Sequence, residues 1–476
     1  MKELKMFIDG RFIDNESGKW IKVLNPSTEE VISLMPDGTV EDARKAIDAA
    51  EKAQNQWERT PSIERAAYLT KIAAGIRKRE KELTDIIVRE GGKTQGLANV
   101  EVLFTADYMD YMAGWARRYE GEIIPSDRPH ENIFLFKRPI GVTTGILPWN
   151  FPFFLVARKA APALITGNTI VIKPSQLTPE NAYVFAQIVE EAGLPAGVFN
   201  LVNGRGSVIG HELSANPKVG MVSLTGSVGA GQQTMAAAAP NITKVSLELG
   251  GKAPAIVMKD ADVDLAVKSI IASRVINTGQ VCNCAERVYV DKAIKETFME
   301  KLVAGMKQVK VGNEVADLDM GPLIEASALE SMEKKVERAI QQGARLLCGG
   351  HRIGTKGYFF EPTVLDCVTQ KMDIIQEETF GPILPVVEYS DINDAIAWAN
   401  DCEYGLTSSV YTQNLDNAFK VMRSLKFGET YINRENFEAM QGFHAGWRKS
   451  GIGGADGKHG LEEYLQTQVV YLETKE

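Results

Sequence analysis

The chain has 476 residues, of which 44% are hydrophobic, and a formal net charge of −9. This acidic balance disfavours nucleic acid or an anionic membrane as the partner, because both require a basic surface. A single hydrophobic core stops growing at roughly 250 to 300 residues, so we expect two large domains.

The sequence shows neither an apolar leader nor an apolar run long enough to cross a bilayer, so we expect a cytoplasmic protein. Its five cysteines are too few and too oddly numbered for a disulfide framework.

Helical periodicity dominates the region from Thr39 to Arg118, where apolar residues recur at helical spacing. Thr39 followed by Asp42 is the pattern of a capping box that begins a helix. After Gly121 the pattern changes to short β-rich runs at 133–137 and 141–147. These runs read as too exposed and irregular for the same layer, and we expect them to form a protruding ribbon.

Strands and helices alternate in the next region, as expected for a parallel sheet built from strand–helix–strand units. Strands are predicted at residues 169–173, 198–202, 221–224, 244–247 and 255–258. The helix predicted at 178–191 has Thr178 as its N-cap and Pro179 at its first position. We therefore expect one open, doubly wound sheet of the dinucleotide-binding kind.

A second α/β unit is expected from about residue 250 to 433, with helices at 263–277 and 329–342. The first of these helices leads into a cysteine-containing loop. The last apolar strand, at 468–472, has no partner nearby in the sequence. If it pairs with a sheet edge of another subunit, it helps to build an oligomer.

Two short segments carry residues suited to nucleophilic and base chemistry. Cys282 follows Gly-Gln-Val among small residues, where a thiol can meet a small electrophile. Glu248 stands between Leu247 and Leu249, where partial desolvation would raise its pKa toward the range of a general base. Cys282 and Cys284 form a C-x-C pair, but this is a weak metal motif without further ligands, and we expect no metal site.

Two glycine turns that follow strands are candidates for a pyrophosphate site at a helix N-terminus. One spans 203–207 and includes Gly206, and the other spans 224–229, where Ser227 adds a hydroxyl donor. Either turn alone is a weak signal, because strand-to-helix turns in α/β proteins commonly use glycine for packing.

These segments, together with Leu-Pro-Trp-Asn-Phe-Pro at 147–152 and Glu-Glu-Thr-Phe-Gly-Pro at 377–382, resemble the motifs of the NAD(P)-dependent aldehyde dehydrogenase family nearly from end to end. Around Arg158 and residues 433–450, the chain is more similar to the bacterial lactaldehyde and glycolaldehyde dehydrogenases of that family. The resemblance implies an α/β fold with a doubly wound Rossmann-type cofactor domain, an α/β catalytic domain and a small β oligomerisation ribbon. The implied boundaries are 1–119 and 140–248 for the cofactor domain, 249–455 for the catalytic domain, and 120–139 and 456–476 for the oligomerisation and bridging segments.

The resemblance also implies the catalytic roles. Cys282 attacks the aldehyde, and the side-chain amide of Asn150 with the backbone N–H of Cys282 binds the oxyanion. Glu248 activates the water that releases a carboxylic acid. Lys159 matches a lysine near the active site, and a salt-bridged helix residue is the equally supported alternative.

The implied cofactor is NAD. Lys173 would hold the adenosine ribose, Glu378 the nicotinamide ribose, and Phe380 would brace the nicotinamide; a capped turn with a core phenylalanine is the alternative for the last two. Gln176 stands where NAD-preferring members commonly have a glutamate, so we expect NADP to be accepted as well. The complete implied set is Leu147, Trp149, Lys173, Ser175, Gln176, Gly206, Ser227, Leu249, Glu378 and Phe380.

Arg158, Asn283 and His444 are the predicted substrate residues. Many relatives have aromatic residues at positions 158 and 444, so two polar groups would replace aromatic walls here. Such a pocket favours a short aldehyde with a hydroxyl or carboxylate, although Arg158 could instead form a structural salt bridge. Gln466 and Gln468 replace a glutamate and a lysine of many relatives, which puts a second proton relay in doubt.

We therefore expect an enzyme that oxidises lactaldehyde or glycolaldehyde to the acid through a cysteine thiohemiacetal and thioester. The alternatives are a small-semialdehyde dehydrogenase, in which Arg158 binds a carboxylate, and a catalytically silent structural protein of the same fold. A CoA-acylating enzyme is less favoured, because Glu248 supplies the water-activating base. The expected partner besides the aldehyde is a second copy of the chain, and the resemblance favours a homotetramer over a dimer.

Overall fold

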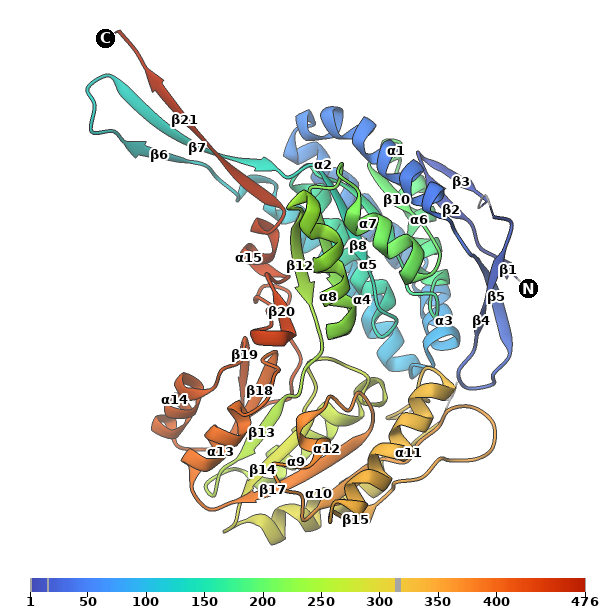
Figure 1. The fold of residues 1–476 in the computed structure, drawn as a ribbon, viewed down its shortest axis with the longest axis vertical. Coiled ribbons are helices and arrows are strands. Elements are labelled where there is room, and N and C mark those ends of the chain that lie inside the picture. Colours follow the sequence, from blue (N-terminus) through green and yellow to red (C-terminus); the bar gives the residue numbers. More distant parts are fainter. Residues whose placement is uncertain (1, 15–16, 313–317, 476) are drawn as a thin grey trace.

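Two α/β lobes and a projecting β ribbon make up the chain in the computed structural model, which describes residues 2–14, 17–312 and 318–475 (Figure 1). The remaining positions of the predicted domains lie outside the described residues. In the described part of the chain, no helix has the length and apolar character needed to span a bilayer.

The first lobe is built on an eight-stranded sheet with the order β20-β12-β11-β8-β9-β10-β2-β3. Its strands are β2 (Met6–Ile8), β3 (Arg11–Ile13), β8 (Val142–Ile146), β9 (Thr169–Lys173), β10 (Phe199–Leu201), β11 (Met221–Thr225), β12 (Lys244–Glu248) and β20 (Gly451–Ile452). The five strands from β8 to β12 run parallel. The chain adds strands on one side of β8 and then on the other, so the predicted doubly wound arrangement is confirmed.

Helices cover this sheet, and most lie where the sequence predicted them. They are α1 (Val40–Arg59), α2 (Ser62–Lys78), α3 (Glu80–Gly91), α4 (Gln95–Ala113), α5 (Pro152–Ile165), α6 (Glu180–Glu191), α7 (His211–Ala215) and α8 (Val228–Ala238). The capping box of α1 is present, with Thr39 Oγ1 accepting from the Asp42 N–H at 3.2 Å. The predicted N-cap of α6 is wrong, because the Glu180 N–H donates to the Glu90 carboxylate of α3 at 2.7 Å instead of to Thr178.

The second lobe is built on a seven-stranded sheet with the order β15-β16-β17-β14-β13-β18-β19. Its strands are β13 (Pro254–Val257), β14 (Arg287–Asp291), β15 (Arg345–Cys348), β16 (Thr363–Asp366), β17 (Ile383–Tyr389), β18 (Thr407–Tyr411) and β19 (Glu429–Ile432). Its helices are α9 (Val263–Val275), α10 (Lys295–Gln308), α11 (Ala326–Gln341), α12 (Asp373–Gln376), α13 (Ile392–Asn400) and α14 (Leu415–Ser424). The prediction that residues 255–258 extend the first sheet is therefore wrong, since β13 pairs with β14 and β18.

The ribbon contains β6 (Glu122–Pro125), β7 (Glu131–Pro139) and β21 (Leu465–Glu473), and it projects from the first lobe with the C-terminus at its tip (Figure 1). β21 pairs along its whole length with β7, so the partner of the C-terminal strand lies in the same chain. The prediction that the run at 141–147 belongs to the ribbon is wrong, because β8 is buried in the middle of the first sheet.

Smaller elements connect the lobes and the ribbon. A separate sheet near the N-terminus contains β1 (Lys2–Glu3), β4 (Trp20–Leu24) and β5 (Val31–Pro36). The turn η4 (Ile276–Gly279) connects α9 to the loop of Cys282, and α15 (Gly457–Glu462) leads into β21. The short helical turns besides η4 are η1 (Gly114–Arg117), η2 (Gly206–Gly210), η3 (Ala239–Asn241) and η5 (Arg448–Ser450). In this fold the carboxyl ends of β8, β11 and β12 in the first lobe face the Cys282 loop of the second lobe.

Candidate active site

The larger of two adjoining cavities lies at the carboxyl ends of β8, β9 and β11, where the strand order of the first sheet reverses. Open α/β sheets bind ligands at such a switch point. The cavity has a volume of about 1420 Å³. Every residue predicted to bind the cofactor lines it: Leu147, Trp149, Lys173, Ser175, Gln176, Gly206, Ser227, Leu249, Glu378 and Phe380.

Two groups in this cavity suit a dinucleotide. Lys173 is buried at the end of β9, its ammonium donates to the Pro174 carbonyl at 2.9 Å, and burial lowers its pKa to about 8. Ser227 is the N-cap of α8 and accepts from the Ala230 N–H at 3.2 Å, so its hydroxyl proton can be donated to a ligand. A helix N-terminus favours phosphate, and a buried ammonium favours ribose oxygens.

Glu378 and Phe380 form the other end of the cavity. The Glu378 carboxylate accepts from the Gly251 N–H at 2.8 Å, and burial raises its pKa to about 7. A Cβ on Gly250 would lie 2.6 Å from this carboxylate, so the glycine permits the close approach. The Phe380 and Trp149 rings lie nearly perpendicular to each other, with 5.6 Å between their centroids. Contacts with Gly251 and Trp149 thus hold Glu378 and Phe380 at this end of the cavity. This arrangement suits the predicted binding of the nicotinamide ribose.

The smaller cavity, of about 650 Å³, shares four residues with the larger one. The shared residues are Asn150, Thr225, Glu248 and Cys282. Its apolar lining consists of Val100, Phe104, Phe151, Phe154, Leu155, Val281 and Phe437. A substrate in this cavity and a cofactor in the other would therefore meet at the predicted nucleophile, base and oxyanion donor.

The loop before Cys282 is tied directly to Asn150. Asn150 Nδ2 donates to the Gln280 carbonyl at 3.1 Å, and Asn277 Nδ2 donates to the Asn150 carbonyl at 3.1 Å. Cys282 is partly exposed, whereas Cys284 is buried and donates to the Val281 carbonyl at 2.9 Å. Burial raises the pKa of the Cys284 thiol to about 12, so Cys282 is the thiol available for chemistry.

Glu248 ends β12 as a buried carboxylate beside two cations of α5. Lys159 Nζ lies 2.6 Å from Glu248 Oε1, and Arg158 Nη1 lies 3.6 Å from Glu248 Oε2. Burial opposes ionisation of Glu248 most strongly, but the charges of Lys159 and Arg158 outweigh it and lower the pKa of Glu248 to about 2. The predicted raised pKa is therefore wrong, because the neighbours in space and not the flanking leucines determine it.

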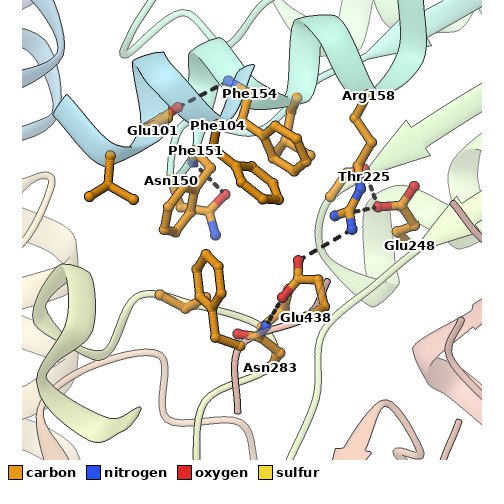
Figure 2. Close-up of a pocket in the computed structure, with 15 residues that line it drawn as sticks. Glu101, Phe104, Asn150, Phe151, Phe154, Arg158, Thr225, Glu248, Asn283 and Glu438 are labelled. Atoms are coloured by element: carbon orange, nitrogen blue, oxygen red, sulfur yellow. Dashed lines mark hydrogen bonds and ion pairs between the residues drawn. The ribbon is translucent and has the colours of Figure 1, made fainter. Parts of the chain in front are cut away.

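Arg158 lines the smaller cavity and is also salt-bridged, so both interpretations of this residue apply. Its Nε donates to Asp456 Oδ1 at 3.0 Å, and its Nη2 donates to Glu438 Oε1 at 3.2 Å. Figure 2 shows the guanidinium between the carboxylates of Glu248 and Glu438. Asn283 Nδ2 donates to Glu438, which places the predicted Asn283 in the same network.

Glu438 and Thr225 are polar cavity residues that the sequence did not reveal. Thr225 Oγ1 donates to Glu248 Oε2 at 3.2 Å. Glu438 has a different environment. It lies in the 433–450 segment that carries the narrower resemblance, but no motif or spacing marks it as a site residue. Only its contacts with Arg158 and Asn283 identify it.

His444 lines neither cavity, and it is buried with its Nδ1 hydrogen-bonded to Glu429. Its predicted contact with the substrate therefore stays a prediction. Burial opposes its charge, but Glu429 and the contact with Cys282 raise the pKa of His444 well above its usual value. The expected loss of aromatic walls is only partial, since Phe154 and Phe437 still line the cavity. The pocket is therefore apolar on one side and polar on the other.

Comparison with known proteins agrees with this geometry. The sequence pattern of the Aldehyde dehydrogenase family matches residues 12–470. The chain is 68% identical to lactaldehyde dehydrogenase of Escherichia coli K12, over 98% of each chain. It is 43% identical to 3,6-anhydro-alpha-L-galactose dehydrogenase of Vibrio sp. strain EJY3, over 99% of each chain.

Solved structures agree as well. The crystal structure of lactaldehyde dehydrogenase from Escherichia coli superimposes with a TM-score of 0.98 at 67% identity, over 99% of each chain. A structure of 3,6-anhydro-L-galactose dehydrogenase gives a TM-score of 0.97 at 42% identity, over 99% of this chain and 100% of the other. The resemblance and the fold class predicted from the sequence are thereby confirmed: the chain belongs to the aldehyde dehydrogenase family and is an NAD(P)-dependent oxidoreductase.

Proposed function

We propose that the enzyme oxidises lactaldehyde or glycolaldehyde to the corresponding carboxylic acid, with NAD as its main cofactor. The observation that carries the chemistry is that Cys282, Asn150 and Glu248 stand where the two cavities meet. The observation that supports the substrate is the identity of 68% to lactaldehyde dehydrogenase of Escherichia coli K12.

The reaction begins at Cys282. Its thiolate attacks the aldehyde carbon, and the oxyanion that forms accepts from Asn150 Nδ2 and from the Cys282 N–H. Asn150 already donates one amide proton to Gln280, and its second amide proton serves the oxyanion. Loss of one such donor typically costs on the order of 100-fold in turnover.

NAD, when bound in the larger cavity, would accept the hydride from the thiohemiacetal carbon, which would leave a thioester on Cys282. Glu248 then takes a proton from water, the hydroxide adds to the thioester carbon, and the carbon–sulfur bond breaks to release the acid and the Cys282 thiolate. For this step Glu248 must move its carboxylate from Lys159 to the water. Lys159 is therefore a positioning residue that keeps the base ionised.

The polar side of the smaller cavity favours a hydroxyl over a carboxylate on the substrate. Asn283 and Glu438 offer an amide and a carboxylate to a 2-hydroxyl group. Arg158 is surrounded by the carboxylates of Asp456, Glu438 and Glu248, so little of its charge is available to a semialdehyde. A small-semialdehyde dehydrogenase is therefore the less favoured alternative.

Relaxed cofactor selectivity follows from Gln176, which is exposed at the edge of the larger cavity. Its side chain is uncharged, so it does not repel a 2′-phosphate. We infer that NADP is also used, with lower efficiency than NAD.

The enzyme is a homo-oligomer that assembles through its ribbon. β21 is one of the two edge strands of the ribbon, and its Val469, Tyr471 and Leu472 side chains are exposed. An open apolar edge favours pairing with another copy. The domain boundaries implied by the resemblance are part of this proposal, supported by the change from the first sheet to the second between β12 and β13.

The test is the reduction of NAD and NADP by the purified protein with lactaldehyde, glycolaldehyde, succinic semialdehyde and propanal. We expect the highest kcat/KM with the two hydroxyaldehydes and NAD, and loss of turnover in the Cys282→Ser variant. Turnover confined to succinic semialdehyde would reassign Arg158 to carboxylate binding. A folded protein without turnover for any pair would support a structural role.

A further inference from the structure

A buried ion cluster lies outside both cavities and has no part in the mechanism above. Glu286 Oε2 lies 2.8 Å from Lys252 Nζ, and Glu286 Oε1 lies 3.2 Å from Arg274 Nη1. The exposed fraction of each of these side chains is at most 1%. Burying charged groups away from water costs free energy. We therefore ask which other parts of the protein these three side chains contact.

The Glu286 carboxylate holds the backbone of the segment that faces the cofactor cavity. It accepts from the Thr379 N–H at 2.6 Å and from the Phe380 N–H at 2.9 Å. Lys252 Nζ also donates to Thr379 Oγ1 at 2.8 Å. Thr379 stands between Glu378 and Phe380, both of which line the cavity. The cluster therefore lies directly behind the residues assigned to the nicotinamide end of the cofactor.

Phe380 adopts a backbone conformation that requires such support. Its φ is +52°, in the left-handed region that residues other than glycine rarely occupy. A conformation of this kind persists only where its surroundings hold it. The hydrogen bond from the Phe380 N–H to Glu286 is one such restraint, on a residue whose ring packs against Trp149.

The same cluster holds the loop of the nucleophile. Arg274 Nη1 donates to the Ala285 carbonyl at 2.9 Å, and Arg274 Nη2 donates to the Gly279 carbonyl. These two carbonyls lie on either side of Cys282 in the sequence. One set of buried charges thus contacts both the nucleophile loop and the cofactor-facing segment.

We propose that Glu286 is a positioning residue for the cofactor: its carboxylate, held by Lys252 and Arg274, fixes the backbone of Thr379 and Phe380 relative to the Cys282 loop. The inference rests on the proposed function for its account of what the cavity binds. A glutamine at position 286 would present one acceptor oxygen and one donor NH₂ to two backbone N–H groups. An aspartate would keep the charge but would be one methylene group shorter.

The test compares Glu286→Gln and Glu286→Asp with the wild type by isothermal titration calorimetry with NAD. We expect the Kd for NAD to rise about tenfold or more in Glu286→Gln, because a hydrogen bond to a charged group that aligns the binding segment is lost. The KM for NAD should rise with it. The KM for the aldehyde should rise less than the KM for NAD, because Arg274 remains and still donates to the Ala285 and Gly279 carbonyls on either side of Cys282.

Asp366→Asn provides a matched control. Asp366 is also a buried carboxylate with two cationic partners, Lys295 at 3.1 Å and Arg345 at 2.6 Å, but it lies on β16 and lines neither cavity. We expect this variant to lower the melting temperature and leave the Kd for NAD unchanged. Circular dichroism shows whether each variant is folded before its Kd for NAD is compared with that of the wild type.

An unchanged Kd for NAD in folded Glu286→Gln, with or without a lower melting temperature, would overturn the proposal and leave Glu286 a purely structural role. If Glu286→Gln does not fold, the Kd for NAD is measured for Glu286→Asp and for the double variant Glu286→Gln with Lys252→Met. A higher Kd than that of the wild type would support the proposal, and an unchanged Kd would overturn it. A wild type that binds NAD but oxidises no hydroxyaldehyde would refute the proposed function, whereas the binding comparison would still decide the role of Glu286.

Discussion

Lys159 of α5 and Glu248 of β12 form an ion pair in which Nζ lies 2.6 Å from Oε1 and both side chains are buried. Lys159 keeps Glu248, the proposed base, ionised. It also binds the carboxylate that must contact water for hydrolysis. Ionisation at Glu248 and access to water are therefore separate requirements, and the first three predictions concern the charges around this pair.

Lys159→Met should move the acid limb of the pH–rate profile to higher pH. In the wild type the pKa of Glu248 is lowered to about 2, so the base does not titrate in an ordinary assay range. Removing the Lys159 charge leaves the burial of Glu248 opposed mainly by Arg158, so its pKa rises. A base must be deprotonated to act, so an acid limb should appear within the assay range in this variant and not in the wild type. Lys159→Arg keeps the charge and is the control. Identical kcat profiles for Lys159→Met and the wild type would contradict the prediction.

Glu248→Gln should separate hydride transfer from hydrolysis. The amide cannot take a proton from water, so kcat should fall on the order of 100-fold to 10,000-fold. Stopped-flow absorbance should still show a burst of reduced cofactor equal to the number of active sites, because the thioester forms and accumulates. Circular dichroism should first show that the variant is folded, since Lys159 loses its partner. Loss of the burst as well would place Glu248 before hydride transfer.

Glu438→Gln should improve the use of succinic semialdehyde. The Glu438 carboxylate lines the smaller cavity and accepts from Arg158 at 3.2 Å, so it both repels a substrate carboxylate and occupies the guanidinium. We expect the ratio of kcat/KM for succinic semialdehyde to kcat/KM for lactaldehyde to rise about tenfold. Glu438→Asp retains the charge and should leave the ratio near that of the wild type. A fall in the ratio for Glu438→Gln would disagree with this account.

Gln176→Glu should make the enzyme more selective for NAD. The residue is exposed at the edge of the larger cavity, so a carboxylate is tolerated there without burial. It would repel the 2′-phosphate of NADP, and we expect the kcat/KM for NADP to fall about tenfold or more while that for NAD changes little. Gln176→Ala, which adds no charge, separates charge from size. Equal losses with both cofactors would show that Gln176 does not discriminate between them.

Local sequence signals predicted the parts of the fold that neighbouring residues determine. The capping box of Thr39 and Asp42 joins residues three positions apart, and the structure contains it. The helix that begins at Glu180 is capped by Glu90, a residue of another helix, which no local pattern indicates. The run at 141–147 was predicted to be exposed and irregular, yet 142–146 form a buried strand with a parallel neighbour along each edge. Burial of this kind depends on segments distant in the sequence.

The same distinction applies to the site. The motifs around Cys282, Asn150 and Glu248 could be identified because each is a contiguous segment, and the fold brings these segments together. The protonation state of Glu248 depends on Lys159 and Arg158, which are far from it in the sequence, so the flanking leucines gave the wrong direction for its pKa. No spacing rule marks Glu438, because its role depends on contacts with side chains from other segments.

Lysine substitutions on the ribbon test whether its open edge is the contact between subunits. Val469 and Tyr471 have exposed fractions of 46% and 66%, and they lie on the strand whose outer edge has no partner within the described chain. Val469→Lys with Tyr471→Lys should disfavour edge pairing, because charged side chains on an edge strand oppose association. Light scattering coupled to size exclusion should then report a smaller species than the wild type. The melting temperature of the monomer should change little, since both side chains are already in water. An unchanged mass would exclude this edge as the contact and would direct attention to the other exposed apolar residues of the ribbon, such as Ile123.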